Sequence, residues 1–261
     1  MQRMQYLATN SKYSWFLRFN SEIIPVLHRA SKHVNISPMK TAKGIVEELF
    51  WDGSARITCP PELIPAPGQY LLAHANASPD LLPVPLFSSN STPNGFRSGP
   101  PLPRIWRPGD SLTMRGPIGH GFALPSAARK VALVAFDDSP ARVLGLIPLV
   151  LKQGAEIVLV SDKVTEDLPE IIEVQPLKAM HEILQWADYS ALDAARENLN
   201  QLQGMFAGQN QAGLQCEAQV LVRAPMPCGA LAACGVCAVT VHHEWKMVCK
   251  DGPVFSLKEL L

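Results

Sequence analysis

Four cysteines lie within 22 residues near the C-terminus, and this feature constrains the chain more than any other in its sequence. They are Cys228, Cys234, Cys237 and Cys249, in the spacing C-x5-C-x2-C-x11-C. Thiols at this density are typical of a metal-binding or redox site rather than of an ordinary packed core. Whatever the chain folds into must bring these side chains together.

The loop between these cysteines has the composition that an iron–sulfur cluster requires. Such a loop wraps the inorganic core, points several thiolates inward and brings backbone N–H groups close to sulfur. Small residues permit this close approach, and five are present: Gly229, Ala230, Ala232, Ala233 and Gly235. Plant-type 2Fe–2S loops have the spacing C-x4-C-x2-C with a remote fourth ligand, and this loop is one residue longer. The spacing predicts a 2Fe–2S cluster on all four cysteines and an electron-transfer role.

Two other interpretations of the cysteines stay open. A structural zinc site usually has two C-x2-C pairs, whereas only Cys234 and Cys237 form such a pair here. A dithiol redox pair at these two residues would leave the first and fourth cysteines unexplained. His242 and His243 lie between the third and fourth cysteines, and one of them could replace a thiolate. Because four cysteines suffice, we interpret both histidines as solvated turn residues.

Composition excludes several classes of function and sets the compartment. Lys+Arg and Asp+Glu both total 23, so no net charge favours nucleic acid. No apolar run approaches the roughly 20 residues that span a bilayer. The apolar patch at 15–17 is interrupted by Arg18 and Glu22, so the first 38 residues lack the plan of a signal peptide. We therefore expect a cytoplasmic protein whose thiols stay reduced. The two isolated cysteines, Cys59 and Cys216, are expected to be small buried apolar residues.

Two kinds of sequence pattern divide the rest of the chain. Residues 40–120 predict short strands with turns, including a hairpin at Asp52-Gly53 and a loop at 88–103. This pattern favours an antiparallel barrel. Residues 131–160 predict a strand, a helix over 141–152 and a second strand, which form a βαβ unit. We expect a short strand at 171–174, one or two helices over 177–203 and a strand over 216–222.

Several segments resemble the electron-transfer subunit of class 1B dihydroorotate dehydrogenases. The C-terminal part has M-P-C-G-A-L-A-A-C-G-V-C at 226–237 and V-C-K-D-G-P-V-F at 248–255. Upstream, P-G-Q-Y at 67–70 and R-G-P-I-G-H-G-F at 115–122 are similar to the family's P-G-Q-F/Y and G-P-x-G-x-G-F segments. The resemblance covers roughly residues 40–257, with its motifs in the family's order.

The resemblance implies an α+β multidomain, ferredoxin-reductase-like fold. Its parts are an N-terminal extension (1–39), a flavin-type barrel (40–122), an α/β pyridine-nucleotide-type domain (123–223) and a 2Fe–2S domain (224–261). In the family, electrons pass between a nicotinamide, FAD, the cluster and the FMN of a catalytic partner. The implied partner is a dihydroorotate dehydrogenase-like flavoprotein of pyrimidine biosynthesis, in a hetero-oligomer. The implied FAD-binding residues are Pro85, Ser88 and Gly116.

The cofactor motifs depart from the family. Its flavin signature R-P-x-S is replaced by V-P-L-F at 84–87, with Ser88 one place late, and its Gly-Thr turn by S-G-P at 98–100. Valine cannot form the hydrogen bonds that a guanidinium makes with phosphate. Arg97 or Arg104 could supply a compensating charge, so FAD stays a candidate cofactor.

The nucleotide motif departs further. The family has a G-G-G-x-G turn that lets a pyrophosphate approach backbone N–H groups at a helix start, whereas this chain has A-F-D-D-S-P at 135–140. Asp137 and Asp138 would face the pyrophosphate, and Phe136 would block its approach. We interpret Asp138 or Ser139 as a helix cap, and we expect that NAD does not bind.

The sequence therefore favours an electron-transfer subunit that is not a catalyst by itself. The alternatives are an FAD-dependent NAD(P)H reductase and a non-redox scaffold with a zinc site. We expect some of the apolar residues near the ligands to form a rim that contacts a partner; the alternative is that they only pack the cluster domain against the barrel. These residues are Met226, Pro227, Leu231, Val254 and Phe255. For the N-terminal extension, either residues 13–33 form a helix that lies on a partner, or Met39 is the true start.

Overall fold

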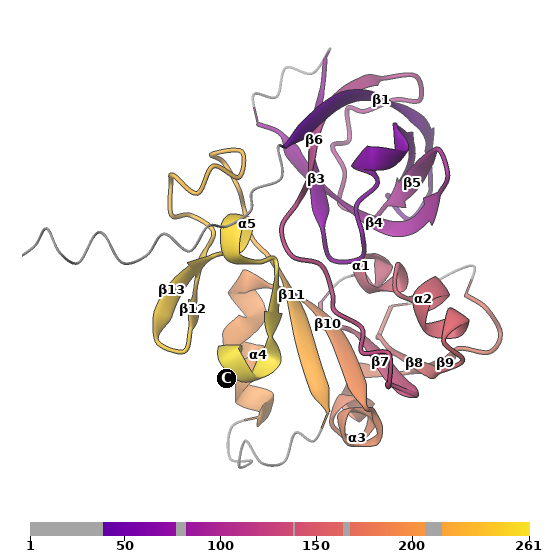
Figure 1. Cartoon of the computed structure of the whole chain (residues 1–261), viewed down its shortest axis with the longest axis vertical. Coiled ribbons are helices and arrows are strands. Elements are labelled where there is room, and N and C mark those ends of the chain that lie inside the picture. Colours follow the sequence, from indigo (N-terminus) through magenta and orange to yellow (C-terminus); the bar gives the residue numbers. More distant parts are fainter. Residues whose placement is uncertain (1–38, 77–81, 138, 164–167, 207–215) are drawn as a thin grey trace, which may run out of the picture. The chain divides into compact units, whose positions relative to one another are not determined.

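The computed structural model describes residues 39–76, 82–137, 139–163, 168–206 and 216–261 (Figure 1). The predicted helix at 13–33 lies outside them. The described residues form a closed barrel, a six-stranded sheet and a two-stranded hairpin. In this part of the chain, no helix has the length and apolar character needed to cross a membrane.

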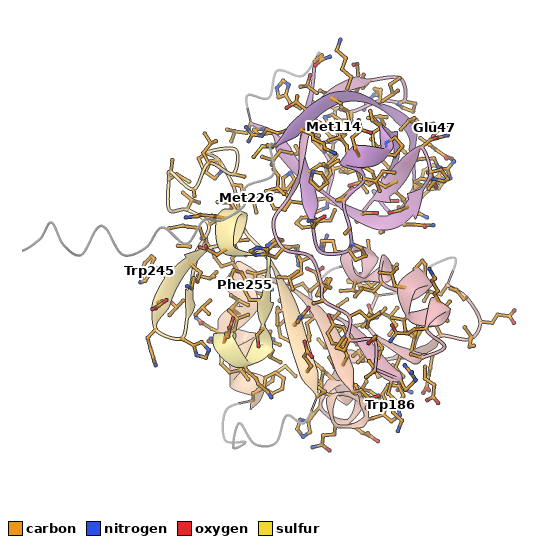
Figure 2. The ribbon with its side chains drawn as sticks, viewed as in Figure 1. Glu47, Met114, Trp186, Met226, Trp245 and Phe255 are labelled. Atoms are coloured by element: carbon orange, nitrogen blue, oxygen red, sulfur yellow. The ribbon has the colours of Figure 1, made fainter. Side chains whose placement is uncertain are left out.

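The N-terminal half of the described chain is an antiparallel barrel, as predicted. Its strands close in the order β1-β2-β5-β4-β3-β6. Their bounds are β1 (Lys40–Leu49), β2 (Ala55–Thr58), β3 (Tyr70–Ala75), β4 (Val84–Thr92), β5 (Gly95–Ser98) and β6 (Ser111–Ile118). The hairpin at Asp52-Gly53 is confirmed, with Gly53 at a φ of 79°. Residues such as Phe96 and Met114 fill the interior and are fully buried, and Figure 2 labels Met114 within the barrel.

The predicted loop at 88–103 is wrong in its first half. Residues there complete β4 and form β5, which pair antiparallel from Ser88 opposite Ser98 to Thr92 opposite Gly95. Serine and glycine have low strand propensity, but barrel closure gives their backbone groups partners on both sides, and this tertiary pairing overrides propensity. Ser88 and Ser98 are accordingly buried.

The second half of the described chain is built on a sheet in the order β14-β11-β10-β7-β8-β9. Its strands are β7 (Lys130–Ala135), β8 (Glu156–Val160), β9 (Glu173–Gln175), β10 (Tyr189–Ala195), β11 (Glu217–Arg223) and β14 (Val254–Ser256). All neighbours are parallel except β11 and β14. The five parallel strands have the doubly wound order, which reverses between β7 and β10.

Two expectations for this domain need correction. The predicted helix at 141–152 is two short helices, α1 (Ala141–Leu144) and α2 (Ile147–Lys152). The predicted helices over 177–203 are interrupted by β10, which lies between α3 (Met180–Trp186) and α4 (Leu199–Phe206). The alanine-rich sequence of β10 has helical propensity, but its residues are almost all buried between neighbouring strands, and this burial decides its conformation.

The cysteine-bearing segment is joined to the sheet. It contains the hairpin β12 (Ala238–Val241) and β13 (Glu244–Met247), then α5 (Val248–Asp251), β14 and α6 (Leu257–Leu260). Strand β14 pairs with β11, with Phe255 opposite Val220. One core cluster includes Tyr70 of the barrel, Leu192 of the sheet and Val248 beside Cys249. Barrel, sheet and cysteine segment therefore share a continuous packed interior.

Candidate metal centre

The four clustered cysteines come from three neighbouring segments. Cys228 and Cys234 lie in the loop after β11, Cys237 directly precedes β12, and Cys249 lies on α5. Cys237 and Cys249 are buried, Cys228 is half-buried and Cys234 is exposed. The backbone joins the segments that carry Cys237 and Cys249, because Val248 N donates to Cys237 O at 3.1 Å. The site thus has a buried side and a side open to solvent.

The loop is folded so that its backbone N–H groups turn toward sulfur. Gly229, Ala230, Ala232 and Gly235 all have positive φ, between 55° and 70°. This conformation costs a non-glycine residue about 1–2 kcal/mol, and it occurs here at two alanines. Backbone N–H groups of residues in such turns can form a concave nest that binds anions. The strained backbone at Ala230 and Ala232 is typical of a loop that is shaped around a bound group, here a negatively charged one.

The thiol of Cys228 is the clearest acceptor in this nest. The N–H of Ala233 is the main cause that lowers the pKa of Cys228 to about 6. Partial burial opposes this effect, and Cys234 and the N–H of Leu231 reinforce it. A thiolate is the form that binds iron, so the loop favours the ligand state at this position.

The buried side of the site holds the other pair of thiols. Burial is the main cause that raises the pKa of Cys249 to about 12, and Cys237 and Cys228 raise it further, while the N–H of Ala232 opposes them. The four side chains thus form two pairs, Cys228 with Cys234 and Cys237 with Cys249. Two pairs of thiolates are the donor set that two irons require.

Two further observations bear on the alternative ligands. Among the described residues, the four clustered cysteines included, no group of three or more His, Cys, Asp or Glu side chains is arranged to hold a metal ion. His242 and His243 are exposed at the β12–β13 turn, where both have positive φ. Four thiols with backbone N–H groups beside Cys228 and Cys249 are the donor chemistry of an iron–sulfur cluster. The assignment of the four cysteines as its ligands stays a prediction.

The D-G-P-V segment at 251–254 connects the cysteine segment to the barrel and to β13 by hydrogen bonds and packing. Asp251 Oδ2 accepts from Met247 N at 2.7 Å, which closes α5 onto β13. Gly252 O accepts from His120 N at 2.7 Å, at the exit of the barrel. A Cβ at Gly252 would lie 2.5 Å from the Phe255 ring, so only glycine fits there. This packing explains why the segment has so specific a sequence.

The five apolar residues near the ligands divide between the core and the surface. Met226, Val254 and Phe255 are buried in the core, because they pack the cysteine segment against the barrel and the sheet. Pro227 is exposed and Leu231 is 66% exposed, so some of the five residues are open to a partner. Sequence reasoning missed Trp245, which is 77% exposed. Figure 2 shows Trp245 at the outer edge of the hairpin, away from Phe255. The apolar surface near the cysteines is thus formed by loop and hairpin residues.

The predicted FAD-binding residues lie on β4 and β6 and have packing roles of their own. Pro85 is half-buried, and Ser88 is buried with its Oγ 3.0 Å from Ser91 Oγ. Gly116 has a φ of 148°, and a Cβ there would lie 2.7 Å from a methyl group of Leu71. These packing contacts explain why Pro85, Ser88 and Gly116 occupy their positions even if no ligand is bound. FAD binding at these residues stays a prediction.

The two arginines considered as compensating charges lie in different surroundings. Arg97 donates to Ser54 Oγ at 2.7 Å and to Asp52 Oδ2 at 2.9 Å. Its guanidinium also lies 4.1 Å from the centre of the Phe50 ring. Arg97 is therefore engaged at the β1–β2 hairpin. Arg104 is exposed between β5 and β6.

Helix α1 packs directly on the turn that aligns with the family's flavin-contacting Gly-Thr. A Cβ at Gly99 would lie 2.9 Å from Ala141 Cβ, and one at Gly145 would lie 3.0 Å from Ser88 O. At these positions the barrel and the α/β domain are in van der Waals contact. Protein atoms occupy this face of the turn.

The carboxyl ends of β7 and β10 form the crevice where doubly wound sheets bind dinucleotides. Asp137 follows β7 and was expected to face a pyrophosphate. Instead it accepts hydrogen bonds from Ala195 N, Asn198 Nδ2 and Arg223. Of the two predicted helix caps, Ser139 Oγ accepts from the N–H of the first residue of α1 at 3.3 Å. Asp138 lies outside the described residues.

A second carboxylate completes a charged network in this crevice. Asp193 accepts from Arg142 Nε at 2.6 Å and from Arg223 Nε at 2.9 Å. Burial raises the pKa of Asp193, and the two guanidinium groups oppose this shift. Phe136 is buried, with its N–H bonded to Asp193 O at 3.0 Å. Carboxylates and their cationic partners therefore line this crevice. The expectation that NAD does not bind here stays a prediction.

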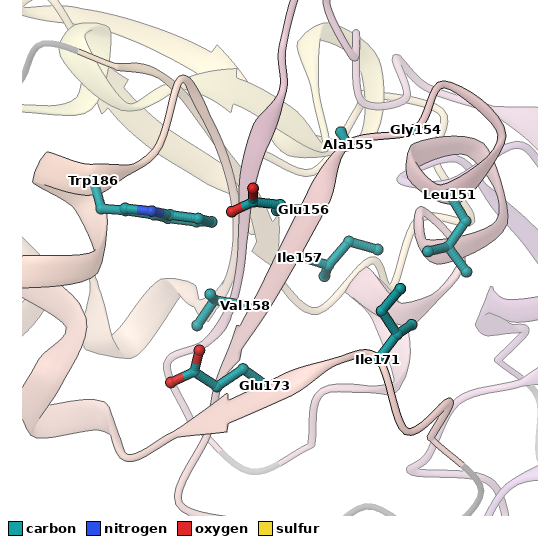
Figure 3. A pocket seen from close by; sticks show the side chains of 9 residues that line it. All are labelled: Leu151, Gly154, Ala155, Glu156, Ile157, Val158, Ile171, Glu173 and Trp186. Atoms are coloured by element: carbon teal, nitrogen blue, oxygen red, sulfur yellow. The ribbon is translucent and has the colours of Figure 1, made fainter.

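A separate cavity of about 350 Å³ lies at the far edge of the sheet (Figure 3). Its apolar wall includes Ile157 and Ile171, and Glu156, Glu173 and Trp186 lie on its other side. None of these residues belongs to the cysteine segment or to the crevice at β7 and β10. The cavity is not part of the candidate metal centre.

Comparison with known proteins identifies the type of the C-terminal domain and the fold. Residues 224–261 match the family described as the iron–sulfur cluster binding domain of dihydroorotate dehydrogenase B. The predicted iron–sulfur domain is therefore confirmed as a domain type. Since the match covers only the C-terminal segment, it concerns that segment alone.

Solved structures extend the likeness to the barrel and the sheet. The chain is similar to an NADH-dependent reduced ferredoxin–NADP oxidoreductase studied for flavin-based electron bifurcation, with 17% identity, a TM-score of 0.66 and coverage of 84% of this chain and 90% of that chain. A cytochrome P450 reductase from Amycolatopsis has 12% identity, a TM-score of 0.55 and coverage of 71% of each chain. The FAD apo form of the ferredoxin reductase in carbazole 1,9a-dioxygenase has 16% identity, a TM-score of 0.51 and coverage of 70% and 68%.

These identities are low, so the structural likeness shows the fold alone. It confirms the predicted order of an antiparallel barrel, a parallel-sheet domain and a C-terminal iron–sulfur segment. The chain is thus an electron-transfer protein with an iron–sulfur domain of the dihydroorotate dehydrogenase B type on a ferredoxin-reductase-like barrel and sheet.

Proposed function

We propose that this chain is the electron-transfer subunit of a dihydroorotate dehydrogenase-like complex of pyrimidine biosynthesis, located in the cytoplasm. The observation that carries the proposal is the four-cysteine loop, whose N–H groups point at thiol sulfur within a domain that matches an iron–sulfur family. Cys228 and Cys234 would hold one iron, and Cys237 and Cys249 the other. When bound, a 2Fe–2S cluster supplies a one-electron carrier.

A catalytic flavoprotein is the proposed partner, in a hetero-oligomer. Cys234 lies on the open side of the site, and Leu231 and Val236 beside it are exposed, as is Trp245 on the hairpin. Exposed aromatic and aliphatic residues of this kind are typical of the centre of a protein interface. A partner docked here would place its flavin near the least buried thiolate ligand.

On this proposal, the chain has no nicotinamide chemistry of its own. The network of Asp137, Asp193, Arg142 and Arg223 occupies the crevice where the dinucleotide would bind. The rival function, an intact FAD-dependent NAD(P)H reductase, shares the fold but requires that crevice. FAD is the cofactor that the fold supports at the barrel, and the flavin content of the purified protein decides whether it is retained.

The cluster is tested by spectroscopy and metal analysis of protein purified without oxygen. We expect a brown protein that contains iron and acid-labile sulfide. Substitution of any of Cys228, Cys234, Cys237 or Cys249 by Ser should lower the iron content, whereas Cys59→Ser and Cys216→Ser are matched controls that should retain it. Colourless protein with zinc would contradict the cluster, and full iron retention in Cys249→Ser would contradict the four-thiolate assignment.

The partner is tested by pull-down of the tagged chain from a native lysate. We expect mass spectrometry to identify a dihydroorotate dehydrogenase-like flavoprotein, and we expect Trp245→Ala to reduce its recovery. Trp51→Ala is the matched control, because Trp51 is fully exposed on a barrel hairpin, outside the cysteine segment. Recovery of a monomer with a loaded, readily reduced cluster would count against an obligate partner.

A further inference from the structure

Two side chains of the barrel reach backbone carbonyl groups of the cysteine segment. Arg115, on β6, donates from its guanidinium to the carbonyl oxygen of Gly229, the residue after Cys228. Tyr70, on β3, donates its hydroxyl to the carbonyl oxygen of Cys249 at 3.2 Å. The barrel therefore contacts the segment at the first and at the last of the predicted ligands.

Both donors are held by their own surroundings. Tyr70 is fully buried, and its ring lies 5.7 Å from the ring of Phe87. Arg115 lies opposite Leu72 in the register of β3 and β6, so its backbone is fixed by the barrel. Gly229 has a φ of 64°, and a Cβ there would lie 3.3 Å from the Arg115 guanidinium. Glycine thus lets the cation approach the loop closely.

The electrostatics of Tyr70 show how near these groups are to the thiols. Burial raises the pKa of Tyr70, Cys249, Cys237 and Cys228 raise it further, and Arg115 acts in the opposite direction. One hydroxyl, one permanent cation and three of the four thiols therefore lie within one small region. Charges interact strongly there, because the surroundings are partly shielded from water.

We propose that Arg115 and Tyr70 are positioning residues that hold the cluster-binding loop on the barrel, and that the charge of Arg115 raises the reduction potential of the cluster. This inference rests on the proposed function. Reduction adds one electron from an external one-electron donor to the cluster and breaks no bond. The added negative charge is stabilised by a nearby fixed cation, and net charge and hydrogen bonding are what set such potentials.

The test compares Arg115→Gln, Arg115→Lys and Tyr70→Phe with the wild type. Iron, sulfide and circular dichroism are measured first, and each loaded protein is then titrated with dithionite and followed by electron paramagnetic resonance. Arg115→Gln should shift the midpoint to a more negative potential, and Arg115→Lys should recover much of the shift. Tyr70→Phe keeps the net charge, so it should shift the midpoint less and lose its cluster faster in air.

Arg196→Gln is the matched control. Arg196 also donates to a loop carbonyl, that of Val236 beside Cys237, but this bond is exposed to solvent. Water and salt screen exposed charges, so its shift should be clearly smaller than that of Arg115→Gln.

The outcomes separate this inference from the proposed function. A loaded Arg115→Gln protein with the wild-type potential, or with a shift no larger than that of Arg196→Gln, would overturn the inference alone. A wild-type protein without iron and sulfide would contradict the proposed function as well. A folded Arg115→Gln protein that binds no cluster would support the positioning role, and Arg115→Lys would then report on the charge.

Discussion

Removing Arg142 is expected to destabilise the fold strongly, although the residue lies far from the cysteines in sequence. Its side chain is 2% exposed and that of Asp193 is 1% exposed, and the two are joined at 2.6 Å. Arg142 also donates to the carbonyl oxygen of Pro100 in the barrel. Arg142→Met keeps the apolar part of the side chain but leaves a buried carboxylate with one cationic partner, Arg223, and a carbonyl without its donor.

Breaking a buried ion pair in this way costs about 3–5 kcal/mol. In a domain of this size, each kcal/mol lowers Tm by roughly 2–4 °C, so we expect a decrease of at least about 6 °C. Urea unfolding should show a lower midpoint with an unchanged slope. Replacing both partners, in Arg142→Met/Asp193→Leu, should recover part of the loss, because no buried charge is then left unpaired.

The matched control is Glu48→Gln, which removes an exposed ion pair with Arg56 at 3.2 Å. Both of these side chains are 49% exposed, and such pairs contribute at most about 1 kcal/mol. If Arg142→Met costs no more than Glu48→Gln, the network does not join the barrel to the sheet.

Three further predictions concern other parts of the chain. Calorimetric titration with NADH should show no saturable binding at sub-millimolar concentrations, because Asp137 and Asp193 occupy the crevice, and tight binding would favour the reductase alternative. Partial burial of Asp52 acts to raise its pKa, but hydrogen bonds from Ser54 and the charge of Arg97 outweigh it and lower the pKa. The Asp52 carboxylate should therefore stabilise the fold at pH values above its ordinary pKa of 3.8 and lose this effect as the pH falls further. The unfolding free energies of the wild type and of Asp52→Asn, measured in urea, should differ less at pH 3 than at pH 7. A larger difference at pH 3 would refute the reasoning. Burial raises the pKa of Cys59 to about 11, so alkylation at pH 8 followed by peptide mapping should modify it only in urea, and modification of the native protein would contradict this.

Sequence patterns predicted the features that depend on local chemistry. The cysteine spacing located the candidate site, and alternation with turn residues predicted the barrel. The patterns failed where tertiary contacts decide conformation: β10 is rich in alanine and becomes a strand because it lies between β7 and β11. Serine-rich β4 likewise becomes a strand because the barrel must close.

No sequence pattern predicted the charged network of Asp137, Asp193, Arg142 and Arg223. None predicted the contacts of Tyr70 and Arg115 with the cysteine segment either. The residues of each contact lie far apart in the chain; Tyr70 and Cys249, for example, are separated by 179 positions. One signal was available, since both Tyr70 and Arg115 fall inside segments that resemble the family's motifs. The resemblance marked the segments as important, but their physical role became visible only in the fold.

The pairing of β14 with β11 has a consequence for how the protein matures. The strand that follows Cys249 is the outermost strand of the main sheet, so the cysteine segment is not a detachable appendage. A group that binds the four thiols only in the folded state stabilises the whole cooperative unit. Its binding therefore also stabilises the pairing of β14 with β11 at the edge of the sheet. Insertion of the inorganic group and closure of the last strand are thus linked, and each favours the other.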